Sequence, residues 1–277
     1  MGTPYRGRNR YRTILKAGRI ISNRIAREKG VIGVLGTGAI GRGFGDTDSD
    51  LDLLVYAEPV SVRRLSRLVS VGWTAHRDVG FDIVVVSCER AVKSAVPSAF
   101  WSQIMRWHQQ LSIVLHDTDG RVRKLLADKL IYPDREQKRL LKQYHQEIHE
   151  HLVFFPEMWA RRGHLYNVVD TLMRAVQNIV LWIYASNKAF EPYLAKWPFY
   201  HLETKAVPEH VHLKRLTRIY TSPIRNLASA MRIRDDLLNL CQELGIRWEV
   251  YSLAEAHERA RKNWRDLPEE TKRILAW

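Results

Sequence analysis

The chain has 277 residues, of which 45% are hydrophobic, so it is long enough to form two modest domains with buried cores. Its two cysteines, Cys88 and Cys241, lack the paired spacing of zinc sites and disulfide frameworks, which indicates a cytoplasmic protein. The basic N-terminus has no apolar segment of the signal-peptide type, and no apolar run is as long as a membrane span. We therefore expect neither secretion nor a membrane partner.

The net charge of +14 is unevenly distributed. Residues 1–29 carry nine Lys or Arg against Glu28 alone, residues 30–120 carry more acids than bases, and residues 121–277 are basic again. Basic regions around an acidic centre raise the local concentration of a polyanion, so a basic surface for nucleic acid is one interpretation. The charged surface of a thermostable protein is the other.

In chain order, a period of 3.6 residues predicts a helix over residues 11–29, followed by a strand over 31–35. Residues 36–49 are rich in glycine and acids, which predicts an open loop without a helix before a strand that contains Asp50 and Asp52 and runs to Tyr56. A helix over 60–71, a strand over 73–79 and a buried strand over 81–87 follow. The last elements of this half are a mostly helical segment over 91–110 with Trp101, Met105 and Trp107 in the core, a strand over 112–115, and a helix from 120 to 132 that Asp119 caps.

Acidic side chains gather at the start of two of these strands. Because side chains alternate along a strand, Asp50 and Asp52 are expected on one face of the sheet. Two carboxylates at this spacing repel each other unless a cation lies between them, and Mg²⁺ is the usual ion for oxygen ligands beside phosphates. If the two strands are neighbours, Asp82 joins the pair; Asp78 is a competing third ligand. We prefer Asp82, because the apolar run after it predicts a buried strand.

The segment from Gly36 to Gly41 also spells G-x-G-x-x-G after an apolar strand, as in dinucleotide-binding proteins. That fingerprint requires a helix after the glycines, and residues 39–49 are not expected to form one. A second alternative, an acidic surface turn, leaves Asp52 inside an apolar run unexplained. Both alternatives are therefore disfavoured.

The Gly36-Thr37 pair, the Asp50-Leu51-Asp52 strand and the later Asp82 together resemble the signature of the polymerase-beta-like nucleotidyltransferase superfamily. Thr37 departs from the usual serine but keeps the hydroxyl group. The resemblance covers about residues 20–120, and the fragments at 41–43 and 49–52 resemble those of small stand-alone members. It implies an α+β fold in which a small mixed β-sheet nucleotidyltransferase domain with packed helices, residues 1–132, precedes an all-α helical bundle, residues 133–277, that binds the substrate.

The resemblance also implies an activity, the transfer of a nucleoside monophosphate, AMP from ATP, to a hydroxyl acceptor with release of pyrophosphate. Asp50, Asp52 and Asp82 would hold two Mg²⁺ ions, and Asp82 would take the proton. Gly36, Thr37 and Arg42 would bind the β- and γ-phosphates. The acceptor stays open among RNA, protein and a small molecule. The alternatives are a non-catalytic nucleic-acid or partner-binding protein that retains the fold, and an antitoxin-like adenylyltransferase acting on a partner protein.

From Pro133 onward the sequence predicts long helices, over residues 134–162, 164–186, 211–222, 224–245 and 252–264. The irregular segment 187–200 resembles a segment of stand-alone nucleotidyltransferases, which implies that Lys196 binds a phosphate and that Tyr193 or Trp197 stacks on a ring. A hydrophobic plug between helices is the alternative. His145 and His149, in the fragment HQEIH, superficially resemble a zinc motif, but packed or solvated histidines are expected.

Overall fold

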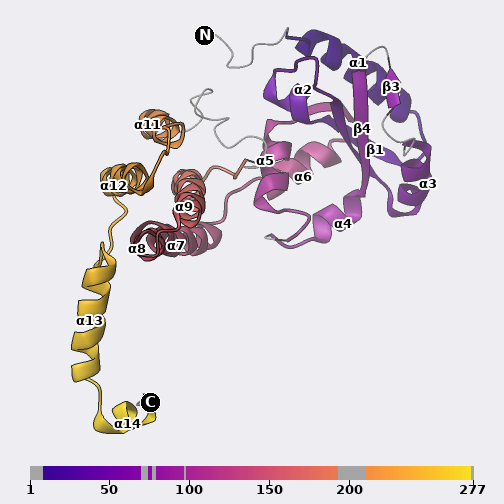
Figure 1. Ribbon diagram of the computed structural model, residues 1–277. Coiled ribbons are helices and arrows are strands. Elements are labelled where there is room, and N and C mark those ends of the chain that lie inside the picture. Colours follow the sequence, from indigo (N-terminus) through magenta and orange to yellow (C-terminus); the bar gives the residue numbers. More distant parts are fainter. Residues whose placement is uncertain (1–8, 70–73, 77–78, 97, 193–209, 276–277) are drawn as a thin grey trace. The chain divides into compact units, whose positions relative to one another are not determined.

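The computed structural model describes residues 9–69, 74–76, 79–96, 98–192 and 210–275 (Figure 1). The chain divides into two compact units: residues 1–133 with 189–193 form the first, and residues 134–188 with 194–277 form the second. The division falls at the Pro133–Asp134 junction, after which the sequence predicts only long helices. Residues 189–193 belong to the first unit, although they follow residues 134–188 of the second unit in the sequence.

A five-stranded mixed sheet forms the centre of the first unit. Its strands are β1 (Val31–Gly36), β2 (Leu51–Ala57), β3 (Thr74–His76), β4 (Val79–Ser87) and β5 (Ile113–Asp117), in the order β3-β4-β2-β1-β5. Strands β2 and β4 run parallel, whereas β1 pairs antiparallel with β2 and β5, and β3 pairs antiparallel with β4. The α+β fold class expected from the sequence, a small mixed sheet with packed helices, is therefore confirmed.

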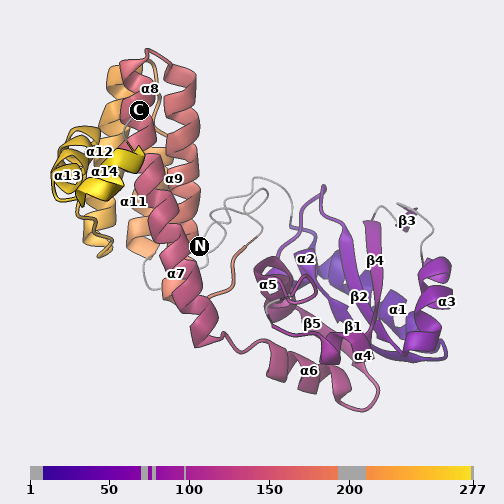
Figure 2. The ribbon, with the colours of Figure 1, turned by 90° about the horizontal axis from the view of Figure 1, so that it is seen from below.

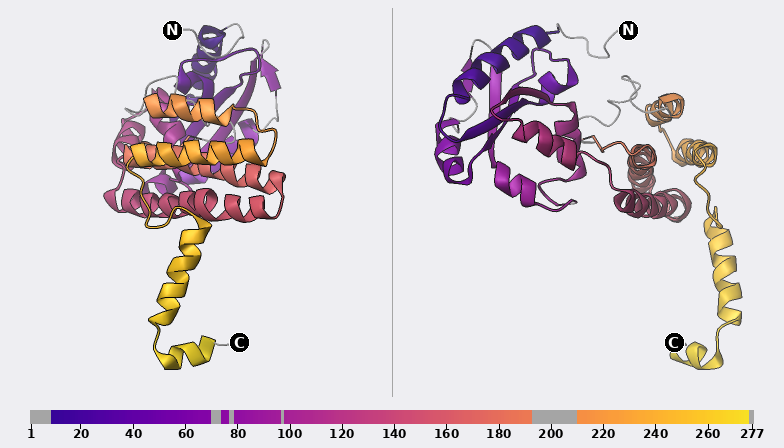
Figure 3. Two further views of the ribbon diagram at one scale, coloured as in Figure 1. Left: turned by 60° about the vertical axis from the view of Figure 1, so that its left-hand side comes forward. Right: turned by 180° about the vertical axis from the view of Figure 1, so that it is seen from behind.

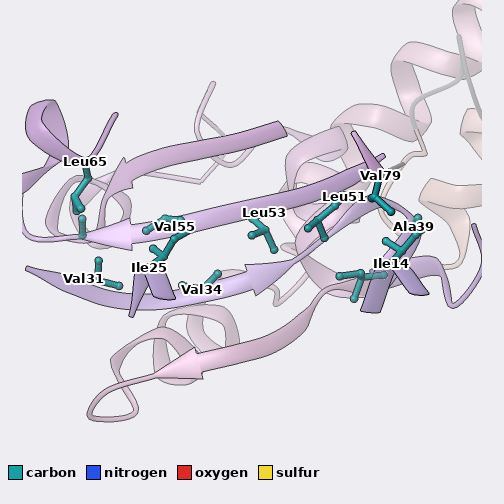
Figure 4. Packing of buried hydrophobic residues seen from close by; sticks show 12 residues of the cluster. Ile14, Ile25, Val31, Val34, Ala39, Leu51, Leu53, Val55, Leu65 and Val79 are labelled. Carbon is teal, nitrogen blue, oxygen red and sulfur yellow. The ribbon is translucent and has the colours of Figure 1, made fainter. Parts of the chain in front are cut away.

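Helices α1 (Tyr11–Ile25) and α3 (Pro59–Val69) cover one face of this sheet. Ile14 and Ile25 of α1 and Leu65 of α3 are buried in one cluster with three residues of β2, which are Leu51, Leu53 and Val55 (Figure 4). These three residues occupy alternate positions of β2, so the residues between them face the opposite side of the sheet. This alternation fixes the direction in which Asp52 points.

The opposite face is covered by α4 (Cys88–Lys93), α5 (Gln103–Leu111) and α6 (Arg121–Lys129). Leu54 and Tyr56 of β2 are buried there with Trp101, whose indole Nε1 donates a hydrogen bond of 2.9 Å to Ala91 O. The segment 91–110, predicted to be mostly helical, contains parts of two helices, because the chain leaves α4 at Ser94 and starts α5 after Ser102, whose side chain caps it. The predicted burial of Trp101 and Trp107 is confirmed.

Two further local predictions fail for physical reasons. A five-residue helix, α2 (Gly38–Arg42), follows the glycines where no helix was expected, because Ala39 and Ile40 are buried against the sheet and stabilise the turn. Helix α6 is capped by the Asp117 carboxylate, which accepts hydrogen bonds from the backbone N–H groups of Val122 and Arg123, rather than by Asp119 alone. The antiparallel pairing of β1 and β2 excludes the dinucleotide-binding βαβ unit, whose strands are parallel.

The second unit is helical (Figures 2 and 3). It contains α7 (Asp134–His149), the π-helical turn η1 (Glu150–Phe154), α8 (Phe155–Arg161), α9 (Leu165–Ser186), α11 (His210–Tyr220), α12 (Leu227–Glu243), α13 (Leu253–Arg265) and α14 (Glu269–Leu275). Helix α9 is the centre of this bundle, because it packs against α7, α8, α11 and α12. In the described part of the chain, no helix has both the length and the apolar character needed to cross a bilayer.

The histidines of α7 are structural. His145 Nε2 lies 2.9 Å from Arg247 O and His149 Nε2 lies 3.0 Å from Val250 O, while the His149 ring stacks on Trp248 at a centroid distance of 5.4 Å. These contacts fasten the segment after α12 to α7. The packed interpretation of the HQEIH fragment therefore holds, and the zinc interpretation has no support among the described residues.

Candidate active site

Two carboxylates lie side by side on the sheet. In the parallel pairing of β2 with β4, Asp52 is the direct partner of Asp82. Side chains at paired positions of parallel strands point to the same face, and adjacent strands are about 4.8 Å apart. Both carboxylates consequently project from the face opposite α1 and α3, next to each other. The sequence predicted that Asp82 would join Asp52 if their strands were neighbours, and the two strands are neighbours with both residues on the same face.

Asp50 lies immediately before β2 and is half-buried. The turn that precedes it is held by Ser49, whose hydroxyl accepts a hydrogen bond from Asp46 N at 3.0 Å and donates one to Asp46 Oδ1 at 2.8 Å. Ser49 thus fixes the turn, as expected, and orients the chain for its entry into β2. Because Asp50 precedes the first residue of β2, strand alternation does not fix the direction of its side chain, and the shared face of Asp50 and Asp52 stays a prediction.

The glycine turn after β1 reaches the same acids. Thr37 N donates a hydrogen bond of 3.0 Å to Asp52 O, which holds the turn against the start of β2. Gly38 has a φ of +51°, and a β-carbon built on it would lie 1.6 Å from Asp52 Oδ2. A side chain at position 38 would therefore displace the Asp52 carboxylate. Sequence reasoning assigned a role to Gly36 and Thr37 but missed Gly38, although the third position of the G-x-G pattern was the available signal.

The surroundings of Asp82 differ from the prediction. Asp82 is exposed, whereas the apolar run after it predicted a buried strand. The reason lies in the sheet order: β3 covers the outer side of β4 only up to Phe81, so the stretch from Asp82 to Ser87 runs along an edge in the described part of the sheet. The argument that burial forces Asp82 to bind a metal is therefore wrong. The case for Asp82 as a metal ligand rests instead on its pairing with Asp52.

The remaining predicted phosphate ligands have different outcomes. Gly36 is buried at the end of β1, where a β-carbon would lie 2.8 Å from Ile40 Cγ2, so the missing side chain lets α2 fold back over the strand; its contact with a phosphate stays a prediction. Arg42 is half-buried at the end of α2. Lys196, with Tyr193 and Trp197, lies outside the described residues, as does Asp78. The assignment of Arg42 and Lys196 to phosphates thus remains a prediction.

The residues present suit a magnesium ion that is shared with a substrate. Mg²⁺ commonly takes one or two protein carboxylates and completes its shell with substrate phosphates and water. Asp52 on the central strand β2 and the exposed Asp82 on its neighbour β4 supply such a pair. Among the described residues, no three acidic, histidine or cysteine side chains are grouped as a complete metal site. The pair fits the ion only when phosphates contribute the other ligands, and the set of three carboxylates holding two ions stays a prediction.

The strongly basic helices of the first unit lie away from these acids. Neither α1 nor α3 contains an acidic residue, and both expose basic side chains: Arg12, Lys16, Arg19 and Arg24 on α1, and Arg63, Arg64 and Arg67 on α3. Both helices pack on the face of the sheet opposite Asp52. A polyanion bound along α1 and α3 would therefore be separated from Asp52 and Asp82 by the sheet itself.

No protein-family model matches this sequence, and no curated protein does either. Among solved structures, the chain is similar to a nucleotidyltransferase-like protein from Exiguobacterium sibiricum, with 13% identity and a TM-score of 0.44 over 82% of this chain and 74% of that one. It is also similar to a spectinomycin adenyltransferase from Enterococcus faecialis, crystallised with ATP and spectinomycin, with 11% identity and a TM-score of 0.34 over 84% and 99%. At such values the chemistry must be argued from the residues of this chain.

Proposed function

We propose that this protein is a nucleotidyltransferase that transfers a nucleoside monophosphate, AMP from ATP, to an acceptor hydroxyl. The observation that carries the proposal is the pairing of Asp52 with Asp82 on one face of the sheet, directly beside the Gly36–Gly38 turn. A carboxylate pair next to a glycine turn provides both a cation site and backbone N–H groups within reach of phosphates.

The residues have separate roles in this proposal. Asp52 and Asp82, with Asp50, would hold two Mg²⁺ ions, which supply Lewis-acid stabilisation of the charge on the reacting phosphates. Gly36 and Thr37 hold the turn where the β- and γ-phosphates lie, with Arg42 and Lys196 as further phosphate ligands. The acceptor oxygen forms a bond to the α-phosphorus, the bond between that phosphorus and the bridging oxygen breaks, and pyrophosphate leaves with the electron pair. The proton of the acceptor hydroxyl passes to the Asp82 carboxylate.

The proposal is tested by incubating the purified protein with Mg²⁺, a cell extract and ATP labelled at either the α- or the γ-phosphate, followed by fractionation into RNA, protein and small molecules. We expect label from α-labelled ATP to become attached to an acceptor in one fraction, and no protein-dependent attachment of label from γ-labelled ATP, because the γ-phosphate leaves in pyrophosphate. The Asp52→Asn variant should lose the transfer. Asp48→Asn, which changes an exposed acid in the turn before β2, should retain it.

The fractionation also separates the alternatives. Label in the protein fraction would favour an adenylyltransferase that modifies a partner protein, and label in RNA would favour a nucleic-acid acceptor. Absence of acceptor-bound label from all three fractions, with Asp52→Asn behaving like the parent in nucleotide binding, would contradict the enzyme and favour a binding protein that retains the fold.

A further inference from the structure

A cavity of about 420 Å³ opens on the same face of the sheet as the acid pair. Its lining includes Leu54 of β2 and Val84 and Val86 of β4, with Phe100 and Met105 from the segment around the start of α5. Leu54 and Val84 are themselves paired, two residues beyond Asp52 and Asp82. The cavity therefore begins about 7 Å along the strands from the two carboxylates. Its volume is that of a site for a small molecule, and its lining is largely apolar.

A buried glutamine of α5, Gln109, is also part of the lining of this cavity. Gln109 on α5 is 2% exposed, and its Oε1 accepts a hydrogen bond of 2.7 Å from the Tyr56 hydroxyl. Burial raises the pKa of the Tyr56 phenol, so the hydroxyl stays protonated and is able to donate this bond to Gln109 Oε1. The Gln109 Nε2 group then has no acceptor among the described residues. A buried donor left unpaired costs about 1–3 kcal/mol, so a ligand that offers an acceptor atom would recover that energy.

The order of the strands places the cavity on the acceptor side of the site. The glycine turn follows β1, Asp52 lies on β2, and Asp82 and Val84 lie on β4, which is on the other side of β2 from β1. In an in-line displacement the attacking oxygen approaches opposite the leaving group. With pyrophosphate at the turn after β1, the attacking hydroxyl lies over β4, next to the cavity.

We propose that the acceptor is a small molecule whose apolar ring enters this cavity. The ring carries a carbonyl or a ring nitrogen that accepts a hydrogen bond from Gln109 Nε2, and the hydroxyl that attacks the α-phosphorus lies outside the cavity beside Asp82. This assignment rests on the proposed nucleotidyl transfer and narrows its acceptor to a drug-sized molecule rather than RNA or protein. The bonds made and broken are those of the transfer step described above.

Two matched substitutions test the cavity. Val84→Trp fills it and is tolerated by the fold, because Val84 is 49% exposed on the edge strand. Val92→Trp adds the same bulk at a position that is 53% exposed on α4 and does not line the cavity. The probes are 4-fluoroacetophenone and 1-ethyl-4-fluorobenzene, which have similar shapes and differ in the carbonyl acceptor. Their binding is followed by fluorine NMR in the absence of nucleotide.

We expect the parent and Val92→Trp to bind the ketone about five- to tenfold more tightly than the ethyl compound, the ratio given by one hydrogen bond of about 1–1.5 kcal/mol. Val84→Trp should bind neither probe. Gln109→Met should reduce the ratio between the two probes to about one, a readout that a general loss of stability does not produce. Equal binding of both probes by the parent, or unchanged binding by Val84→Trp, would overturn the proposed site.

Transfer assays then identify what the cavity holds. We expect Val84→Trp to keep Mg²⁺-dependent ATP binding and to lose label from the small-molecule fraction. Loss of ATP binding in Val84→Trp would place the nucleotide base in the cavity, and label in RNA or protein that Val84→Trp leaves unchanged would identify a polymer acceptor. Either result would overturn the assignment.

A different set of results is expected if the protein is not a nucleotidyltransferase. The probes would still bind to the parent and to Asp52→Asn, but no fraction would carry label with either protein. That result would refute nucleotidyl transfer, and with it the role of the cavity as an acceptor site. The cavity would remain as a ring-binding site defined by Gln109.

Discussion

Gly38 and the Asp52 carboxylate approach so closely that a β-carbon on Gly38 would lie 1.6 Å from Asp52 Oδ2. The turn after β1 therefore packs directly against the Asp52 carboxylate of β2, and Thr37 N adds a hydrogen bond of 3.0 Å to Asp52 O. Through this contact, the position of the glycine turn and the position of the Asp52 carboxylate depend on each other.

The Gly38→Ala substitution tests this contact, with Gly43→Ala as its control. Both glycines have positive φ angles, of +51° and +71°, so both variants carry a similar backbone cost of about 1–2 kcal/mol. Only the alanine at position 38 collides with Asp52, since a β-carbon at Gly43 meets nothing within 4 Å. We expect the transfer rate of Gly38→Ala to fall about 100-fold. Equal rates in the two variants, measured alongside urea unfolding, would contradict the structural link.

The Asp82→Asn substitution separates stability from ion binding. Like charges on directly paired strand residues destabilise a sheet by about 0.2–1 kcal/mol, so the variant should be slightly more stable than the parent without Mg²⁺. With Mg²⁺ and ATP present, it should gain less stability than the parent because half of the carboxylate pair is missing. Urea unfolding under both conditions measures the two effects. Asp48→Asn should resemble the parent in each, and a gain in Asp82→Asn as large as that of the parent would exclude the ion site.

The second unit should lose stability in mild acid through His149. Burial lowers the pKa of His149 below its ordinary value of 6.5, so folding favours the neutral ring. Its contribution is therefore fully present above about pH 6.5 and is lost as the pH falls toward the lowered pKa. Burial lowers the pKa of His151 in the same direction, so His149→Gln should weaken the pH dependence without abolishing it.

Urea unfolding at several values between about pH 7.5 and 5.5 gives this dependence directly. The His257→Gln variant, which changes an exposed residue of α13, should keep the slope of the parent. A slope that His149→Gln leaves unchanged would show that the contact with Val250 O is not linked to stability through protonation.

The basic face of α1 should affect polyanion binding but not transfer. In a variant with Arg12, Lys16 and Arg19 changed to glutamine, the slope of log affinity against log salt for single-stranded RNA should become shallower by about 2, since each lost phosphate contact contributes about 0.7. Transfer should persist, because α1 packs on the face of the sheet opposite Asp52. Fluorescence anisotropy of a labelled RNA measures the slope.

A charge-matched control is available on the other unit. Changing the exposed Arg135, Lys138 and Lys142 of α7 to glutamine removes the same charge from a different surface. We expect this variant to keep the steeper slope. Equal slopes for the two variants would indicate that RNA affinity depends only on the net charge of the protein. A loss of transfer in the α1 variant would show that the sheet does not separate the basic face of α1 from the acid pair.

Local patterns predicted those parts of the fold in which neighbouring residues determine the outcome. The apolar stripe of α1 and the apolar runs of β1 and β2 identified these elements to within a few residues. The prediction failed where a tertiary contact outweighed a local preference. Burial of Ala39 and Ile40 stabilises a helix in a glycine-rich loop. Between α4 and α5, the Trp101 indole donates a hydrogen bond to Ala91 O and interrupts the helical pattern.

By itself, the sequence determined that Asp52 points away from its neighbours Leu51 and Leu53 and that a second acid-bearing strand follows, because alternation is a property of one strand and needs no partner. Only the tertiary structure decided that β2 and β4 are parallel neighbours in the register that pairs Asp52 with Asp82. It also decided that Gly38 touches the first acid, and that Gln109, distant in sequence, lines a cavity beside the pair. Strand order and register depend on the packing of helices against both faces of the sheet, an energy summed over residues far apart in the chain, which no local pattern contains.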